Sequence, residues 1–329
     1  MAKKIAINGF GRIGRLTLRN LMVRDDVEIV GINDLTDTAT LAHLFEYDSS
    51  HRRFNGTVVV EGDQIIINGK RIPTFSKCNP EELPWGELKV DVVLECTGFF
   101  RKEEQAMLHI QAGAKKVLLS APAKTAGIPT IVKGVNDQIL TGADLIVSNA
   151  SCTTNCLAPL VKVIDDNWGL QYGFMSTIHA YTANQKLQDA PHSDLRRARA
   201  AALNMIPTST GAANALALVM PSLKGKISAS SIRVPVATGS LVELVCALDQ
   251  SVDAETVNAT FKAAAEGAFK GILEYSEKPL VSTDIISNPY SSIFDAPLTT
   301  VHNGMLKVTS WYDNEAGYAA RLAELATMV

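Results

Sequence analysis

One cysteine in the segment SNASCTTNCLAP, residues 148–159, has the setting of a reactive thiol. Cys152 is flanked by Ser151 and Thr153, and a helical apolar pattern runs from it to Ile164. A thiol at a helix N-terminus has its thiolate form stabilised by the helix dipole. The pattern therefore predicts a nucleophile whose pKa lies below the free value of about 8.5.

Other roles for this cysteine fit the pattern less well. A disulfide with Cys156 would join two positions four apart on one helix, and five scattered cysteines, an odd number, suit a reducing compartment. Zinc would need more Cys or His ligands at short spacing, so no metal site is predicted. The ordinary alternative is a buried structural thiol, which fits Cys96, Cys156 and Cys246 because each lies in an apolar pattern.

A nucleophilic cysteine needs a base and an electrophile. Among the six histidines, His179 lies in a predicted strand and is one of several candidates for the base. Beside a nicotinamide cofactor, such a thiol has a specific use. It adds to an aldehyde, the resulting hemithioacetal gives up its C–H as hydride, and a thioester remains.

The start of the chain has the pattern of a dinucleotide-binding unit. Gly9, Gly11 and Gly14 follow an apolar strand pattern with G-x-G-x-x-G spacing, and a helical pattern and a second strand come next. Gly9 allows a tight turn, Gly11 lets the backbone approach a pyrophosphate, and Gly14 lets helix and strand pack closely. Asp34 lies 34 − 14 = 20 residues beyond the last glycine, where a carboxylate meets the ribose 2′-OH of NAD. NAD is therefore the predicted cofactor.

The first half of the chain alternates strand and helix patterns, which predicts a parallel sheet covered by helices. Segment 57–75 instead predicts antiparallel hairpins appended to that sheet. The expected fold class is α/β, with a Rossmann-type parallel sheet domain. The strands expected in its parallel sheet are residues 3–9, 27–33, 90–96, 116–120, 130–135 and 145–148.

Beyond Pro159 the strand patterns lengthen, and several alternate apolar with polar residues. This half is predicted to be an α+β catalytic domain with a mainly antiparallel sheet. A final amphipathic helix, 315–329, is assigned back to the first domain. The NAD-binding domain then comprises 1–151 and 315–329, and the catalytic domain comprises 152–314. The other elements expected here are strands 174–182, 227–236, 241–248 and 305–312 and helices 152–164, 211–219 and 253–269.

Charge and hydropathy exclude several classes of partner. The chain carries 31 Lys and Arg against 34 Asp and Glu, which gives no electrostatic reason to expect nucleic acid or an anionic membrane. No apolar run reaches transmembrane length and no signal-peptide pattern is present, so a cytoplasmic location is expected. Segment 183–202 holds three clustered arginines. A partly ordered loop ending in an Ala-rich helix is the favoured interpretation, with a nucleic-acid patch as the alternative.

Eight segments, in order, resemble those of the phosphorylating glyceraldehyde-3-phosphate dehydrogenases, the NAD-dependent enzymes of glycolysis, and the similarity runs from Ile5 to the final helix. The resemblance implies oxidation of D-glyceraldehyde 3-phosphate with inorganic phosphate to 1,3-bisphosphoglycerate. The segments are INGFGRIGR (7–15), ECTG (95–98), SNASCTTNCLAP (148–159), HAYT (179–182), DLRRARAAA (194–202), IPTSTGAA (206–213), RVPV (233–236) and WYDNEAGY (311–318).

The resemblance also implies roles for individual residues. Cys152 is the expected nucleophile and His179 its base. Thr182 and Arg233 match positions that hold the substrate's C3 phosphate. The positions matching an inorganic phosphate site are Ser151, Thr153, Thr210 and Gly211, and those matching the cofactor site, besides the glycines and Asp34, are Arg12, Ile13, Thr97, Gly98, Ser120, Asn314 and Tyr318.

The family resemblance implies a homotetramer. It leaves open an erythrose-4-phosphate dehydrogenase, which would use the same cysteine and histidine. A nucleotide-binding or RNA-binding protein without this chemistry is the alternative from another class. Ala190-Pro191 stands where many NAD-dependent relatives have Leu-Pro. Asp34 and Pro191 are still expected to favour NAD over NADP, because the Asp34 carboxylate would repel a 2′-phosphate.

Asp34→Ala should weaken NAD binding by about 1.5–3 kcal/mol, the range for hydrogen bonds to charged groups. NADP should lose less affinity or gain some, because the carboxylate that repels its 2′-phosphate is removed. Calorimetric titration with both cofactors is the measurement, and an equal loss for the two would contradict this role.

Overall fold

The computed structural model describes residues 2–329, which divide into two compact units. Unit 1 comprises residues 2–131, Gln138–Ala150 and Ala319–Val329, and unit 2 comprises Val132–Asp137 and Ser151–Tyr318. This division differs from the predicted domain limits at Ser151, at 315–318 and at 132–137, all of which belong to unit 2. Segment 132–137 does so because the backbone at Gly134 lies against the side chains of Phe269 and Ile272.

Unit 1 is built on an eight-stranded sheet of order β3-β4-β5-β2-β1-β6-β7-β8. The predicted parallel sheet and its appended antiparallel hairpins are both confirmed. The hairpins join the rest of the sheet where β5 pairs in parallel with β2. The strands are β1 (Lys3–Asn8), β2 (Val27–Asn33), β3 (Val58–Glu61), β4 (Gln64–Ile67), β5 (Lys70–Phe75), β6 (Val92–Glu95), β7 (Lys116–Leu119) and β8 (Ile146–Ser148).

The strand predicted at 130–135 is wrong. Only Thr130 forms an isolated bridge, with Ser148. Two residues later the chain turns, because the Asn136 side chain accepts a hydrogen bond from the Val132 N–H and Gly134 adopts a φ of +81°. The apolar residues of this segment are buried without forming a ladder.

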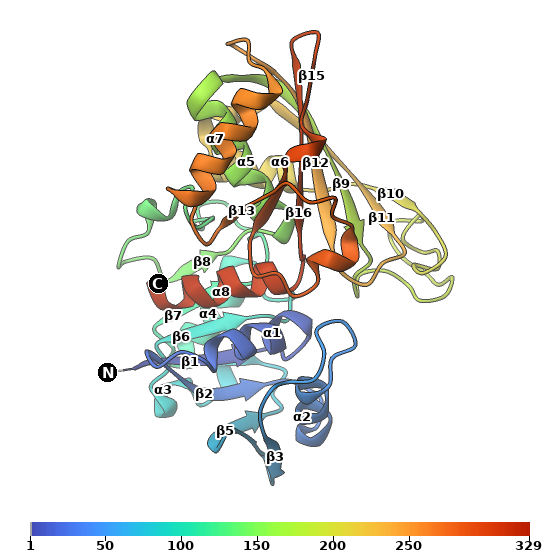
Figure 1. Ribbon diagram of the computed structural model, residues 1–329. Helices are drawn as coiled ribbons and strands as arrows, with labels where there is room; N and C mark the ends of the chain where they lie inside the picture. Colours follow the sequence, from blue (N-terminus) through green and yellow to red (C-terminus); the bar gives the residue numbers. More distant parts are fainter. Residues whose placement is uncertain (1) are drawn as a thin grey trace. The chain divides into compact units, whose positions relative to one another are not determined.

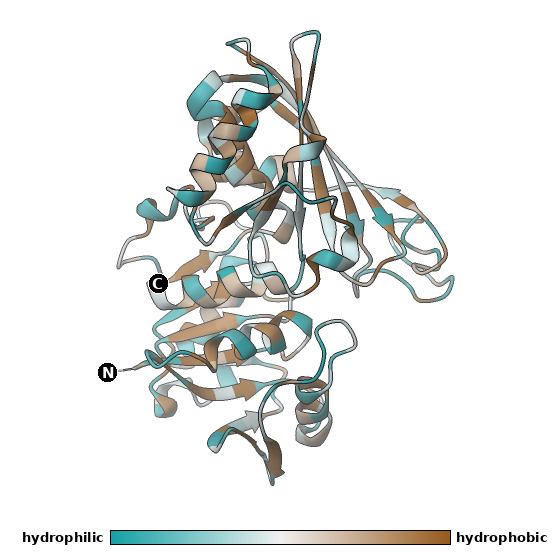
Figure 2. Cartoon of the chain, in the orientation of Figure 1, coloured by the Kyte–Doolittle hydropathy of each residue, from teal (hydrophilic) through white to brown (hydrophobic). Residues whose placement is uncertain are grey.

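Helices cover both faces of this sheet, which its strand sequences require. In β1, Ile5 and Ile7 pack into one core cluster with Leu18 and Leu322, whereas Ala6 packs against Trp85 on the other face. Figure 1 shows α1 and α8 along the sheet, and Figure 2 shows the apolar colour concentrated on its strands. The helices are α1 (Arg12–Leu21), α2 (Thr38–Glu46), α3 (Trp85–Leu88), α4 (Glu103–Gln111) and α8 (Ala316–Met328), which begins in unit 2.

Unit 2 has a second eight-stranded sheet, of order β10-β11-β9-β12-β16-β14-β13, with β15 paired to β16. Most pairs are antiparallel, as predicted, but β9 with β11 and β13 with β14 are parallel. Helices α5 (Cys152–Trp168), α6 (Ala212–Val219) and α7 (Ala254–Glu266) pack beside it (Figure 1). The strands are β9 (Leu170–Ala180), β10 (Ile206–Thr208), β11 (Ile227–Val234), β12 (Ser240–Leu248), β13 (Leu273–Ser276), β14 (Ser292–Asp295), β15 (Thr300–His302) and β16 (Met305–Tyr312).

Segment 183–202 forms turns, so the Ala-rich helix expected at its end is wrong. Asp189 accepts a hydrogen bond from the Ala200 N–H, and Asp194 accepts one from the Arg196 N–H. These side chains take backbone donors that a helix would use, and such local competition favours turns.

Gly14→Ala should destabilise unit 1, because an added Cβ would lie 2.3 Å from the Gly9 carbonyl oxygen at the contact of α1 with β1. We expect a loss of about 1–3 kcal/mol in the free energy of unfolding, as for overpacked sites. Gly142→Ala is the matched control, since its Cβ would meet nothing within 4 Å. Denaturant unfolding of the two variants measures the difference, and equal midpoints would contradict the close contact.

Candidate active site

Cys152 and His179 meet in unit 2. Cys152 is the first residue of α5, and the preceding Ser151 caps this helix by accepting a hydrogen bond from the Thr154 N–H at 3.1 Å. His179 lies near the end of β9, and its Nε2 is 3.6 Å from the Cys152 Sγ. A buried imidazole within hydrogen-bond reach of a thiol is the arrangement of a nucleophile with its base.

Arg233 joins this pair from β11. The parallel register sets Arg233 directly beside His179, and its Nη1 lies 2.8 Å from the imidazole Nδ1 and 3.0 Å from the Ala180 carbonyl oxygen. Nδ1 also lies 2.7 Å from the Ala180 carbonyl oxygen, which only accepts hydrogen bonds, whereas a guanidinium only donates them, so the two contacts favour opposite protonation states of Nδ1. Nε2 is the ring nitrogen that faces the Cys152 sulfur.

The charge states follow from burial and from this arginine. Burial, assisted by the positive charge of Arg233, lowers the pKa of His179 to about 3. Burial also raises the pKa of the Cys152 thiol, although Arg233 and hydrogen bonds from Thr153 oppose that shift. The lowered thiol pKa expected from the sequence is therefore wrong for this arrangement, because burial outweighs the groups that favour the thiolate.

The hydroxyls expected to hold inorganic phosphate are partly engaged already. Ser151 Oγ caps α5, and Thr153 Oγ1 lies 3.0 Å from the hydroxyl of Tyr312. Thr210 Oγ1 accepts a hydrogen bond from the Ala212 N–H, at the start of α6. An added Cβ at Gly211, the N-cap of α6, would meet nothing within 4 Å, so the backbone there is open to approach.

Arg197 is a cation that the sequence reasoning did not assign to the site. Its Nε donates to Thr208 Oγ1 at 2.9 Å and its Nη2 to the Ser209 carbonyl at 3.2 Å, directly before Thr210. Its charge also contributes to lowering the pKa of His179, after burial and Arg233. The DLRRARAAA segment contained the signal, but three neighbouring arginines gave no way to choose among them.

Thr182 follows β9, and its backbone N–H donates to Gln185 Oε1 at 3.3 Å. Asn314 is buried, and its Oδ1 accepts a hydrogen bond from Ser240 Oγ at 2.9 Å, which fixes the orientation of the amide. Tyr318 is also buried, within α8. All of these residues belong to unit 2.

A pocket of about 360 Å³ opens at the carboxyl ends of the parallel strands of unit 1. Its lining includes Gly9, Gly11, Asp34 and Thr97. Gly11 is the N-cap of α1 and provides no side-chain cap, and a Cβ there would meet nothing within 4 Å. A helix N-terminus, an open backbone and a nearby carboxylate fit the pyrophosphate and ribose of a dinucleotide.

The remaining cofactor candidates of unit 1 are not among the residues that line this pocket. The Arg12 guanidinium donates two hydrogen bonds to the Asp48 carboxylate. Burial raises the pKa of Asp48, but the hydrogen bonds that this carboxylate accepts lower it further, to about 2. Ile13 continues α1. Gly98 has a φ of +75°, which turns the chain just after Thr97, and Ser120 follows β7 and bonds to the Cys96 thiol.

The fold and the site define a class: an oxidoreductase with a dinucleotide-binding parallel-sheet unit and a separate unit that carries a cysteine–histidine pair. Two family models match the chain: "Glyceraldehyde 3-phosphate dehydrogenase, NAD binding domain" over residues 3–103, and "Glyceraldehyde 3-phosphate dehydrogenase, C-terminal domain" over residues 151–314. The chain belongs to the glyceraldehyde-3-phosphate dehydrogenase family and is an NAD-dependent dehydrogenase.

Curated relatives match along the whole chain. The chain is 54% identical to glyceraldehyde-3-phosphate dehydrogenase of Mycobacterium tuberculosis over 336 residues, covering 100% of this chain and 99% of that protein. It is 54% identical to the Geobacillus stearothermophilus enzyme over 331 residues, covering 100% and 98%, and 52% identical to that of Clostridium pasteurianum over 325 residues, covering 97% and 96%. Within residues 2–329, no helix has the length and apolar character needed to cross a membrane.

The burial of neutral His179 should make folding stability depend on pH. Its folded pKa, about 3, lies below the ordinary 6.5, so the unfolded chain binds the proton more readily and stability falls as the pH drops below about 6.5. The loss attributable to this group is about 1.4 kcal/mol per pH unit. The His179→Asn variant should lack this loss. Between about pH 7 and pH 5, the free energy of unfolding should therefore fall more steeply for the unsubstituted protein than for the variant, as measured by denaturant unfolding. Parallel curves would contradict the assignment.

Proposed function

We propose that this chain oxidises D-glyceraldehyde 3-phosphate with NAD and inorganic phosphate, giving 1,3-bisphosphoglycerate, with Cys152 as nucleophile and His179 as acid and base. The observation that carries the proposal is the 3.6 Å contact between the Cys152 Sγ and the His179 Nε2 at the start of a helix. We assign NAD binding to unit 1 and the substrate chemistry to unit 2.

The reaction runs in three steps. The Cys152 sulfur bonds to the aldehyde carbon, and the thiol proton passes through His179 to the carbonyl oxygen, which gives a hemithioacetal. His179 Nε2 then takes that O–H proton as the C–H bond breaks, and a thioester remains on Cys152. NAD, when bound, accepts the hydride from that carbon. An oxygen of inorganic phosphate attacks the thioester, the C–S bond breaks, and the acyl phosphate leaves Cys152 as a thiolate.

Arg233 couples substrate binding to this base. For Nε2 to accept a proton, Nδ1 must carry one, and the Ala180 carbonyl oxygen lies 2.7 Å away as its acceptor. Arg233 has to leave Nδ1 for this to happen. With Thr182, it binds the substrate's C3 phosphate, which is the anion that attracts a guanidinium away from a neutral imidazole.

Inorganic phosphate binds near the start of α6. The open backbone at Gly211, the Thr210 hydroxyl and the Arg197 guanidinium supply donors and a positive charge there. Ser151 and Thr153 contribute mainly through the backbone at the start of α5, since their hydroxyls already have partners.

NAD is held by the glycine turn and the N-terminus of α1, with Asp34 accepting from the adenosine ribose. The residues of unit 1 that we assign to the cofactor are Gly9, Gly11, Arg12, Ile13, Gly14, Asp34, Thr97, Gly98 and Ser120. Asn314 and Tyr318 belong to unit 2, and their part in cofactor binding stays a prediction. Arg12 acts through its backbone, because its guanidinium is engaged by Asp48.

The working form is a cytoplasmic homotetramer. Four large apolar side chains in and just beyond segment 183–202 are between 76% and 81% exposed in the single chain, which favours burial against another copy. They are Leu187, Leu195, Leu203 and Met205.

Cys152→Ser should abolish phosphate-dependent NADH formation from glyceraldehyde 3-phosphate, because a serine hydroxyl ionises far less readily and no thioester can form. NAD binding should persist. The matched control is Cys156→Ser, one helical turn further on, whose thiol is buried beside Ser292. NADH absorbance, with and without phosphate and with erythrose 4-phosphate as the competing aldehyde, is the measurement. Activity in the Cys152 variant would exclude the mechanism, and a higher kcat/KM for erythrose 4-phosphate would change the substrate.

A further inference from the structure

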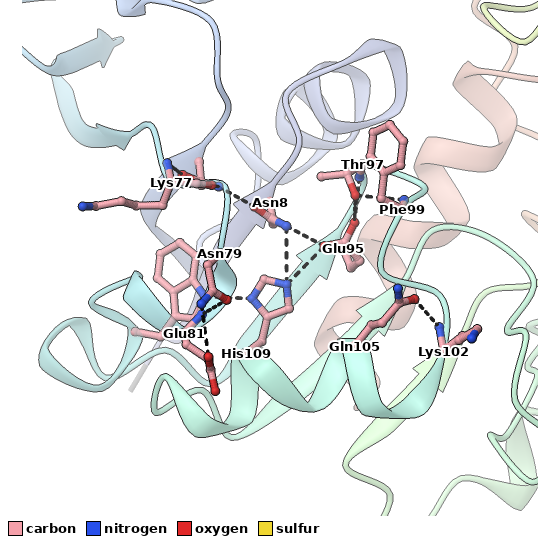
Figure 3. A network of polar contacts seen from close by, with 12 residues as sticks. Asn8, Lys77, Asn79, Glu81, Glu95, Thr97, Phe99, Lys102, Gln105 and His109 are labelled. Carbon is pink, nitrogen blue, oxygen red and sulfur yellow. Dashed lines mark hydrogen bonds and ion pairs between the residues drawn. The ribbon is translucent and has the colours of Figure 1, made fainter.

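A buried carboxylate, that of Glu95, lies at the end of β6, between Asn8, Thr97 and His109 (Figure 3). Glu95 is 2% exposed, and its two oxygens accept four hydrogen bonds. Oε1 accepts from the Thr97 N–H at 2.8 Å and from the Thr97 hydroxyl. Oε2 accepts from Asn8 Nδ2 at 2.6 Å and from His109 Nε2 at 3.1 Å.

The donors around Glu95 are neutral. The indole N–H of Trp85 only donates, and it lies 3.0 Å from His109 Nδ1, so this nitrogen accepts and the ring proton is on Nε2, facing Glu95. Trp85 and His109 are both fully buried. Over residues 2–329, the only basic side chain within ion-pair distance of Glu95 is this imidazole. A buried carboxylate without a countercharge depends on every hydrogen bond that it receives.

The hydrogen-bond network continues from Asn8 to other residues that line the pocket. Asn8 Oδ1 accepts from Asn33 Nδ2 at 2.7 Å. Asn33 in turn donates to the Lys77 carbonyl at 3.0 Å and accepts from the Lys77 N–H at 2.9 Å. Asn8, Asn33, Lys77 and Thr97 all line the pocket. One connected network therefore ties together the ends of β1, β2 and β6 and the segment at Lys77.

We propose that Glu95 is a positioning residue for the dinucleotide: its carboxylate fixes the pocket walls at Asn8 and Thr97, and the His109–Trp85 pair holds the carboxylate in place. The proposal rests on the assignment of this pocket to NAD. Glu95 itself lies outside the pocket lining, so it acts through its partners.

The substitution Glu95→Gln tests this with almost no change in shape. A glutamine keeps one acceptor oxygen, but its NH₂ group faces either the two Thr97 donors or the two donors from Asn8 and His109. Two donors lose their acceptor and the walls shift. We expect the Kd for NAD to rise about tenfold in the Glu95→Gln variant, which equals about 1.4 kcal/mol of binding free energy. The kcat at saturating NAD should fall much less, because the substitution acts on the binding of the cofactor.

Two further measurements keep the proposal testable if that variant folds poorly. Trp85→Phe removes only the indole donor at the far end of the network, and it should raise the Kd for NAD by a smaller factor, about threefold (about 0.65 kcal/mol).

In the unsubstituted protein, NAD should shift the NMR signals of the Trp85 indole N–H and the His109 Nε2–H, which a purely structural network would leave in place. Glu61→Gln, on the exposed strand β3, is the matched control and should change neither Kd nor spectrum.

The outcomes separate the two proposals. If calorimetry detects no NAD binding to the unsubstituted protein, the assignment of the pocket fails. If NAD binds, but Glu95→Gln and Trp85→Phe bind it as tightly as the unsubstituted protein, or the two N–H signals do not respond, the positioning role of Glu95 is overturned.

Discussion

The carboxylate of Glu95 is buried, and among residues 2–329 no lysine or arginine lies within ion-pair distance of it. The carboxyl end of the parallel sheet is arranged around the hydrogen bonds that this carboxylate needs. Three strands end in side chains of this network, and the pocket lies above them. Since an unsatisfied buried charge costs far more than a hydrogen bond gains, the network is stable only when it is complete. The shape of the pocket therefore depends on groups that a ligand never touches.

Unit 2 also contains a buried titratable side chain that needs polar partners. The imidazole of His179 is buried, and Arg233 occupies its Nδ1 from the neighbouring strand. The parallel register of β9 and β11 brings the two residues side by side, so burial and the positive charge of Arg233 together lower the pKa of the imidazole. In unit 1, neutral donors stabilise the buried charge of Glu95, whereas in unit 2 a charged guanidinium contacts the neutral ring of His179.

Local patterns in the sequence predicted much of this. The G-x-G-x-x-G spacing is a steric requirement, and the contacts that a Cβ at Gly9 or Gly14 would make are its physical reason. The helix starting at Cys152 followed from apolar residues at helical spacing, and the structure adds that Ser151 caps it. The α/β alternation predicted the parallel sheet because both of its faces are covered.

What could not be predicted depends on contacts between distant residues. The thiol pKa was expected to be low, because the sequence does not reveal the burial that raises it. Arg197 could not be chosen from three arginines, since its place follows from hydrogen bonds to Thr208 and Ser209. The network around Glu95 joins residues up to 101 positions apart. The turns in 183–202 arise from aspartates that composition alone does not orient.

The last helix has a consequence for how the protein is made. Ala319–Val329 belongs to unit 1, and Leu322 and Leu325, both fully buried, complete the same apolar cluster as Leu18 and Leu21 of α1. A ribosome delivers these residues after the whole of unit 2. Most of unit 1 precedes unit 2 in the chain, but its core cannot close until α8 has been synthesised, so its apolar surface must be protected in the meantime. Unit 1 therefore begins to be synthesised before unit 2, but its hydrophobic core is completed after unit 2 has been made.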